Sequence, residues 1–205
     1  MWVRTHQERF WSITGTVAMV ALFLAFIIHH QETENDEAWT QLGLSQSYIM
    51  QSNWDGARKS LDQWNIRFSR TKAAPYAKFM MADLLYKTSD YAAAQQAYGQ
   101  LAETAHPSDM RPLALSAKIT SEEMAGHPDA AKIDAQNFLT QYPDHFMAAS
   151  IYMTQARLAE KSGDLTQATA LYERFALLYP QSPWTAMVQA RLATLRNLST
   201  PPAAK

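Results

Sequence analysis

The chain has 205 residues, a net charge of −1 and no cysteine. The lack of thiols excludes a disulfide framework, a cysteine-ligated zinc site and a thiol nucleophile. No cluster of basic residues is present, which argues against a nucleic-acid partner because phosphate binding needs a concentrated positive field. Hydrophobic residues make up 47% of the chain and charged residues 18%, so a sizeable core can be buried.

The first predicted element is a transmembrane helix over residues 10–28, which read FWSITGTVAMVALFLAFII without a charge. As a helix this segment rises about 28 Å, close to the hydrocarbon thickness of a bilayer. Arg4 and Arg9 precede it, and acidic residues follow it from Glu32 onward. The excess of arginine on the N-terminal side predicts a short cytoplasmic tail over residues 1–9 and the remaining chain on the far side of the membrane.

A cleaved signal peptide is the competing interpretation of this segment. The apolar run ends in LAFIIHHQ, which lacks a small-x-small cleavage pattern, and it is long for a signal peptide. An uncleaved anchor is therefore favoured. The prediction is a single-pass protein of a bacterial inner membrane with a cytoplasmic N-terminus and a periplasmic C-terminal domain. A eukaryotic organelle receptor with its C-terminal domain in the cytosol stays open as an alternative.

A polar linker is predicted over residues 29–35, with Asn35 as the N-cap of the helix that follows. Prolines lie at expected helix starts, where a missing N–H costs little. The residues after 197 are expected to form a disordered tail, 198–205. The expected helices are Asp36–Gln51, Trp54–Phe68, Pro75–Lys87, Tyr91–Thr104, Pro112–Ala125, Pro128–Tyr142, Phe146–Ser162, Leu165–Tyr179 and Pro183–Asn197.

Much of the chain repeats with a period of 37 residues. A small residue recurs as Ser52, Ser89, Gly126 and Gly163, and an alanine follows five residues later as Ala57, Ala94, Ala131 and Ala168. Further positions of the same register hold Leu61, Tyr98, Ala135 and Tyr172, and then Trp64, Leu101, Phe138 and Phe175. Such a period predicts stacked supersecondary units, with the small residue in a tight turn and the alanine at a close helix contact.

This repeat resembles the tetratricopeptide repeat. The fourth unit matches the motif best, with Ala156, Gly163-Asp164-Leu165, Ala168, Tyr172, Phe175 and Pro180 at its positions. The resemblance implies an all-α fold, in which a TPR-like α-solenoid of four helix-turn-helix units follows the membrane helix. These units and a C-terminal capping helix occupy residues 36–197. Asn53, Asp90 and Asp164 are expected to cap the second helix of units one, two and four.

No pattern typical of catalysis or cofactor binding is present, so neither an enzyme nor a bound cofactor is expected. The sequence has no GxSxG, GxGxxG, P-loop or HExxH motif. His29 and His30 near Glu32 are interpreted as part of a polar segment and not as metal ligands. Glu122 and Glu123 are adjacent on a helix, so they point in different directions and are expected to be solvated.

The resemblance implies that the first helices of the units line a concave groove that binds other proteins. Their register places apolar and aromatic residues nearer the membrane, and polar residues such as Glu123, Arg157 and Glu160 further away. The expected groove residues are Trp39, Leu42, Ile49, Tyr76, Phe79, Tyr86 and Met153. Such a groove suits apolar segments bound with modest sequence preference. The alternative, left open, is that these side chains pack between helices.

The layout of one membrane helix followed by repeats is similar to that of the YfgM-type tetratricopeptide proteins, ancillary subunits of the Sec translocon. This similarity implies a chaperone-like or scaffold role near protein translocation, with a translocon or unfolded envelope proteins as partners and the lipid bilayer bound through the N-terminal helix. The alternative is a structural accessory subunit of a dedicated membrane complex. Gly15 and its small neighbours would then permit close approach of another membrane helix.

Overall fold

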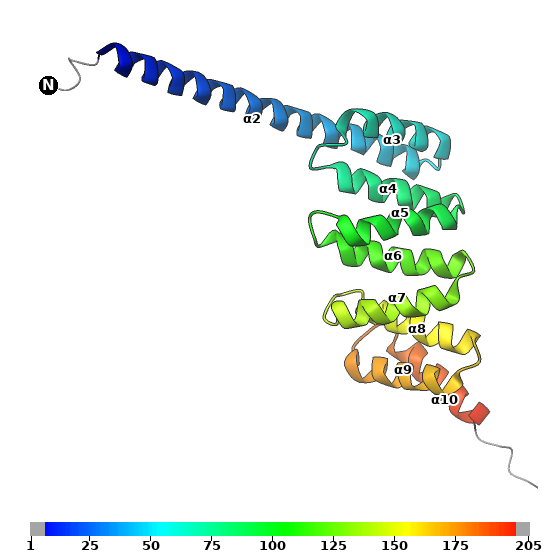
Figure 1. The fold of residues 1–205 in the computed structure, drawn as a ribbon. Coiled ribbons are helices and arrows are strands. Elements are labelled where there is room, and N and C mark those ends of the chain that lie inside the picture. The colour runs from blue at the N-terminus through cyan, green and yellow to red at the C-terminus, as the bar shows by residue number, and fades with distance from the viewer. Residues whose placement is uncertain (1–6, 200–205) are drawn as a thin grey trace, which may run out of the picture. The chain divides into compact units, whose positions relative to one another are not determined.

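The computed structural model describes residues 7–199, with side chains described from Thr14 to Leu198. Over these residues the chain forms helices and turns and no strand, which confirms the all-α prediction (Figure 1). The helices are α2 (Gln7–Met50), α3 (Trp54–Phe68), α4 (Ala74–Lys87), α5 (Tyr91–Thr104), α6 (Met110–Met124), α7 (Pro128–Gln141), α8 (Ala148–Lys161), α9 (Leu165–Leu178) and α10 (Thr185–Ser199).

The described residues divide into two compact units, with the boundary inside α4. The first unit ends at Met81 and contains α2, α3 and the start of α4. The second begins at Ala82 and contains the rest of α4 and helices α5 to α10. The two units are described separately below.

In the first unit, α2 continues without a break through the polar segment 29–35. The prediction that Asn35 caps a new helix is therefore wrong. The segment contains no glycine or proline, and its polar side chains bond within the helix. Thr33 Oγ1 donates to the carbonyl of His29 at 3.0 Å, and Asn35 Nδ2 donates to the carbonyl of Gln31 at 2.8 Å. Asn35 Oδ1 instead accepts the backbone N–H of Lys72, which follows α3.

The last part of α2 packs against α3, which runs back alongside it (Figure 1). Ala38, Leu42, Ser45 and Ile49 form a buried stripe with helical spacing. The Trp64 indole Nε1 donates to the carbonyl of Ala38 at 2.7 Å, and the hydroxyls of Ser45 and Ser60 lie 2.8 Å apart. These two hydrogen bonds, the first buried and the second partly buried, fix the register of the two helices.

Each recurring small residue adopts the left-handed conformation that a tight turn between two helices requires. The φ angles of Ser52, Ser89, Gly126 and Gly163 are 56°, 64°, 82° and 82°. The residue after three of these turns caps the next helix, as predicted. Asn53, Asp90 and Asp164 accept backbone N–H groups at 3.0, 3.3 and 2.9 Å. His127 occupies the corresponding place before α7 and makes no such bond, and Pro128 begins that helix.

The predicted core positions of all four repeats are buried, which confirms the register. The recurring alanines are completely enclosed, and the bulky positions are at most 5% exposed. These residues are Ala57, Ala94, Ala131, Ala168, Leu61, Tyr98, Ala135, Tyr172, Trp64, Leu101, Phe138 and Phe175. The small alanines allow close helix approach, while the aromatic and aliphatic side chains fill the space between helices.

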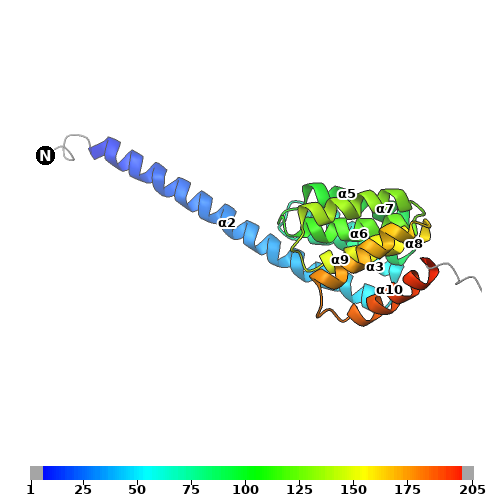
Figure 2. The ribbon, with the colours of Figure 1, turned by 90° about the horizontal axis from the view of Figure 1, so that it is seen from below.

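The last helix covers the apolar face of the pair formed by α8 and α9. Val188, Leu192 and Leu195 of α10 join one buried cluster with Tyr172 and Phe175. Figure 2 shows the ribbon of α10 near that of α9, which it contacts. This placement confirms that the predicted capping helix packs on the last repeat. The predicted disordered tail begins too early, because Leu198 still belongs to α10. The predictions for residues 1–6 and 200–205 lie outside the described residues.

Candidate functional site

Trp39 and Tyr76 form an exposed aromatic pair in the first unit. They lie on α2 and α4 with their ring centroids 5.0 Å apart and their planes tilted by 59°. Trp39 is 43% exposed and Tyr76 is 38% exposed. The two residues are 37 positions apart and so occupy equivalent places in neighbouring repeats. The structure thus brings together two of the predicted groove residues, and both rings remain accessible.

Leu42 and Ile49 cannot serve as exposed groove residues. Both belong to the buried stripe of α2 that packs against α3. For these two positions the alternative interpretation, packing between helices, is the one that the burial supports. The surface of α2 that is available to a partner therefore carries Trp39 but not the aliphatic residues predicted beside it.

The other three predicted groove residues are half-buried. Phe79 lies on α4 in the first unit. In the second unit, the ring of Tyr86 makes an edge contact with Tyr91 at 5.2 Å, and burial raises the pKa of its hydroxyl. Met153 of α8 packs against the cluster that holds α10. Each of these side chains contributes to packing and leaves only part of its surface for a partner.

In the second unit, the predicted polar groove positions are tied together by ion pairs between alternate helices. Glu123 of α6 accepts hydrogen bonds from Arg157 and Lys161 of α8, the latter at 2.7 Å. Glu160 of α8 in turn accepts from Arg191 of α10, whose Nε lies 2.8 and 2.9 Å from its two oxygens. These ion pairs link α6 to α8 and α8 to α10. They neutralise much of the charge that was expected to line the groove.

The pKa values of these two glutamates reflect the pairing. Burial alone would raise the pKa of Glu123, but the hydrogen bonds from Arg157 and Lys161 outweigh that effect and lower it. For Glu160, the hydrogen bond from Arg191 is the largest influence and lowers the pKa. Both carboxylates are therefore held in the charged form that the ion pairs require.

Glu122 was expected to be solvated, and this prediction is wrong because it is only 1% exposed. Its Oε1 lies 3.1 Å from Lys118 Nζ and accepts from Gln95 Nε2 at 3.3 Å. Lys118 also pairs with Asp134 of α7. Glu122 Oε2 is buried without a hydrogen-bond partner among the described residues. Burial raises the pKa of this carboxyl group, and the neighbouring Asp134 adds to the shift.

A second polar pair, partly buried, links α4 and α5. The Tyr98 hydroxyl donates to Asp83, which lies at a predicted groove position. Burial raises the pKa of Asp83 and that of the Tyr98 hydroxyl. The Asp83 carboxylate therefore bonds within the repeat, to Tyr98, and does not point freely into the predicted groove.

No constellation suited to metal binding is found among the described residues, where no three histidine or acidic side chains gather. His30 lies 3.4 Å from Glu34, one turn further along α2, in the exposed polar segment. The apolar part of α2 beginning at Thr14 is long and apolar enough to cross a membrane, and it is unburied.

Comparison with curated proteins gave no match. A family model described as a tetratricopeptide repeat matches residues 150–182, which include α8 from Ser150 onward and all of α9. The match falls on the unit in which the sequence follows the motif best. All-helical repeat folds of this kind are typical of non-catalytic modules that bind other proteins. Together, the matched unit and the four helical pairs with one shared register support a tetratricopeptide repeat protein.

Proposed function

We propose that the chain is a membrane-anchored protein-interaction module that binds apolar protein segments close to the bilayer. The observation that carries this proposal is the exposed Trp39–Tyr76 pair, which is attached to the helix that bears the apolar stretch. Trp39 comes 11 residues after Ile28, a rise of about 16 Å along the helix. Large, rigid aromatic rings are the side chains most often found at the centres of protein interfaces.

Anchoring is supported by the exposed apolar surface of α2. Large apolar side chains project from every side of its first half, among them Val17, Met19, Val20, Leu22, Phe23, Leu24, Phe26 and Ile28. A helix that is apolar all round is stable in a bilayer, whereas in water this surface would drive aggregation. In this proposal the segment from Phe10 to Ile28 spans a bacterial inner membrane, with the N-terminus in the cytoplasm and the repeats in the periplasm.

This topology is tested with reporters fused after Lys205. A phosphatase that is active only outside the cytoplasm should be active there, and a reporter that works only in the cytoplasm should be silent. The opposite result would place the repeats in the cytoplasm. Extraction with carbonate and with detergent tests the anchor itself, because a spanning helix resists carbonate and is released by detergent.

Within this location, we propose a chaperone-like or scaffold role near protein translocation, where newly exported chains expose apolar segments. The alternative is a structural accessory subunit of one membrane complex. It rests on Gly15 and its small neighbours Thr14, Thr16 and Ala18, which permit close approach of another membrane helix.

Photo-crosslinking in intact cells tests the interaction and separates these two roles. A crosslinker placed at Tyr76 should capture partners, whereas one at Ile66 should not, although Ile66 is an exposed apolar residue on α3 of the same unit. Many substoichiometric partners would support the chaperone-like role. One stoichiometric partner would support the accessory subunit. Equal capture from both positions would contradict binding at the aromatic pair.

A further inference from the structure

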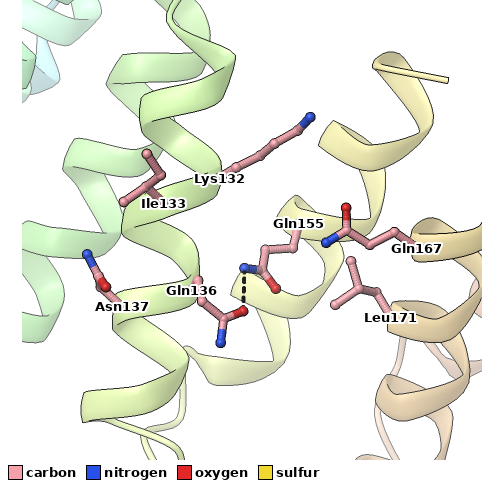
Figure 3. Close-up of a pocket in the computed structure, with 7 residues that line it drawn as sticks. All are labelled: Lys132, Ile133, Gln136, Asn137, Gln155, Gln167 and Leu171. Atoms are coloured by element: carbon pink, nitrogen blue, oxygen red, sulfur yellow. Dashed lines mark hydrogen bonds between the residues drawn. The ribbon is translucent and has the colours of Figure 1, made fainter. Parts of the chain in front are cut away.

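A cavity of about 300 Å³ lies among α7, α8 and α9 in the second unit (Figure 3). Its walls are unusual in carrying several side-chain amides and no acid. Gln136 of α7, Gln155 of α8 and Gln167 of α9 meet there from three helices, beside Leu171. Its volume is at the lower end of the range for ligand pockets, enough for a segment of a few residues.

Gln155 leaves an unsatisfied polar atom beside this cavity. The side chain is only 8% exposed, and its Nε2 donates to Gln136 Oε1 at 3.3 Å. Its Oε1 is buried without a hydrogen-bond partner among the described residues. Turning both amides over exchanges the roles but still leaves one polar atom of Gln155 unpaired. A buried amide in this state destabilises the fold unless something else supplies the missing bond.

Lys132 gives the cavity a positive charge that no acid in the described part of the chain neutralises. Its Nζ donates to the hydroxyl of Ser162 at 2.8 Å, and no described carboxylate lies within 4.0 Å of it. Leu171 and the exposed Ile133 add apolar surface at the same site. Lys132 bonds to a neutral hydroxyl and is therefore available to pair with a negative ligand.

We propose that this cavity binds an acidic peptide segment. The side chain of Gln155 would turn so that its buried Oε1 accepts a peptide N–H, and a peptide carbonyl would accept from the amides of Gln136 or Gln167. The carboxylate would lie beside Lys132, and an aliphatic side chain would cover Leu171. A peptide suits the site because its alternating N–H and C=O groups match the donors and acceptors of side-chain amides. The site belongs to the second unit and does not depend on the aromatic pair of the first.

The test uses the full-length protein in detergent micelles and follows the side-chain amide NMR signals of Gln136, Gln155 and Gln167. Three N-acetylated peptides serve as probes: Ac-Leu-Asp-Leu-NH2, its neutral counterpart Ac-Leu-Asn-Leu-NH2, and Ac-Leu-Leu-OH, whose C-terminal carboxylate is free. The acidic probe should shift these signals and bind about three- to fivefold more tightly than the neutral one, the scale of a partly exposed ion pair. The third probe shows whether a terminal carboxylate serves as well as a side-chain one.

Two variants locate the binding. Lys132→Met should weaken the acidic probe about three- to fivefold, whereas Lys78→Met, the same change at an exposed lysine of α4 outside the cavity, should not. Gln155→Leu should abolish binding while leaving the melting temperature unchanged or higher, because it removes the unpaired amide. If Gln155→Leu fails to fold, Lys132→Met decides the matter.

Several results would overturn the proposal. No shift of the three glutamine signals at millimolar peptide would mean that the cavity holds only water. Shifts that persist in both Lys132→Met and Gln155→Leu would place the binding elsewhere. Equal affinity for the acidic and the neutral probe would mean that Lys132 does not recognise a carboxylate. The site would then not select acidic peptides.

Discussion

Glu122 and Glu123 are adjacent in α6 but bind to different helices and in different electrostatic settings. Glu122 is enclosed beside Lys118 and Asp134, with its Oε1 3.1 Å from Lys118 Nζ. Glu123 accepts from Arg157 and from Lys161, the latter at 2.7 Å. Accordingly, the pKa of Glu122 is raised by burial, whereas the pKa of Glu123 is lowered because its ion pairs outweigh burial. At neutral pH the negative charge of Glu122 therefore lowers the stability of the fold, whereas the negative charge of Glu123 raises it.

Glu122→Gln should raise the stability of the protein at pH 7 by up to about 1 kcal/mol, because an amide removes a disfavoured buried charge and can donate to Asp134. The folded state binds a proton at Glu122 more tightly than the unfolded state, in which the pKa is near 4.5. Lowering the pH through the raised pKa protonates Glu122 itself, so the advantage of the variant should shrink and vanish below about pH 4.5. Thermal melts from pH 4 to pH 8 measure this trend.

Glu123→Gln is the matched control and should lower stability at pH 7 by about 0.5–1 kcal/mol, since both basic partners are partly exposed. Its lowered pKa means that the stabilisation is complete above about pH 4.5 and is lost as the pH falls through the folded-state value. The two variants should therefore differ in sign at neutral pH. Equal destabilisation by both would contradict the different surroundings assigned to them.

Ala168→Leu should lower the stability of the fourth repeat by about 1–3 kcal/mol, because Ala168 is completely buried at the contact of α9 with its neighbours. Ala170→Leu makes the same change at an exposed position of α9 and should have little effect. Chemical denaturation followed by circular dichroism compares the two. Tyr172→Ala should leave a cavity that costs about 3–5 kcal/mol. No effect from either buried substitution would contradict the repeat register.

Gly163→Ala should destabilise the turn between α8 and α9 by about 1–2 kcal/mol, because its φ of 82° is unfavourable for any residue with a Cβ. Nothing lies within 4 Å of an added Cβ, so the effect would be conformational and not a clash. Ser89→Gly, at the equivalent turn, should instead stabilise by less than about 1 kcal/mol, since relief of the left-handed strain exceeds the added freedom of the unfolded chain. Thermal melts of both variants test the pair.

Replacing Trp39 and Tyr76 together by serine should strongly reduce partner capture. Each aromatic anchor at the centre of an interface typically contributes about 2 kcal/mol or more to binding. Stability should change less than after the core substitutions, because Trp39 is 43% exposed and Tyr76 is 38% exposed. Crosslinking yield and melting temperature are measured on the same protein. A destabilised variant whose folded fraction still captures its partner would contradict the proposed binding surface.

The repeat architecture could be predicted from the sequence because it depends on residues close together in the chain. The 37-residue period, the small turn residues and the caps at Asn53, Asp90 and Asp164 each act within a few positions. The break predicted at Asn35 failed because the same polar side chains that cap helices can also bond to a carbonyl four residues earlier. Without a glycine or proline in 29–35, that second possibility lets the helix continue.

The site residues could be predicted only in part, because exposure depends on neighbouring helices. The register correctly placed Trp39 and Tyr76 on equivalent positions, but the burial of Leu42 and Ile49 is set by α3. The enclosure of Glu122 depends on Gln95 of α5 and Asp134 of α7, which the sequence of its own helix does not reveal. The cavity around Gln155 was missed because glutamines have no characteristic spacing, and only the packing of three helices brings them together.

The unbroken α2 gives the aromatic pair a fixed rotational phase about the axis of its anchor. Each residue of an α-helix adds 1.5 Å of height and a turn of about 100°. Deleting one residue from 29–35 would therefore swing Trp39 about a quarter of the way around the helix relative to the apolar stretch. Deleting all seven would lower it by about 10 Å and return it to nearly the same side, since 7 residues make almost two turns. A partner held in the same bilayer would still face the aromatic pair after deletion of all seven residues. After deletion of one residue it would not.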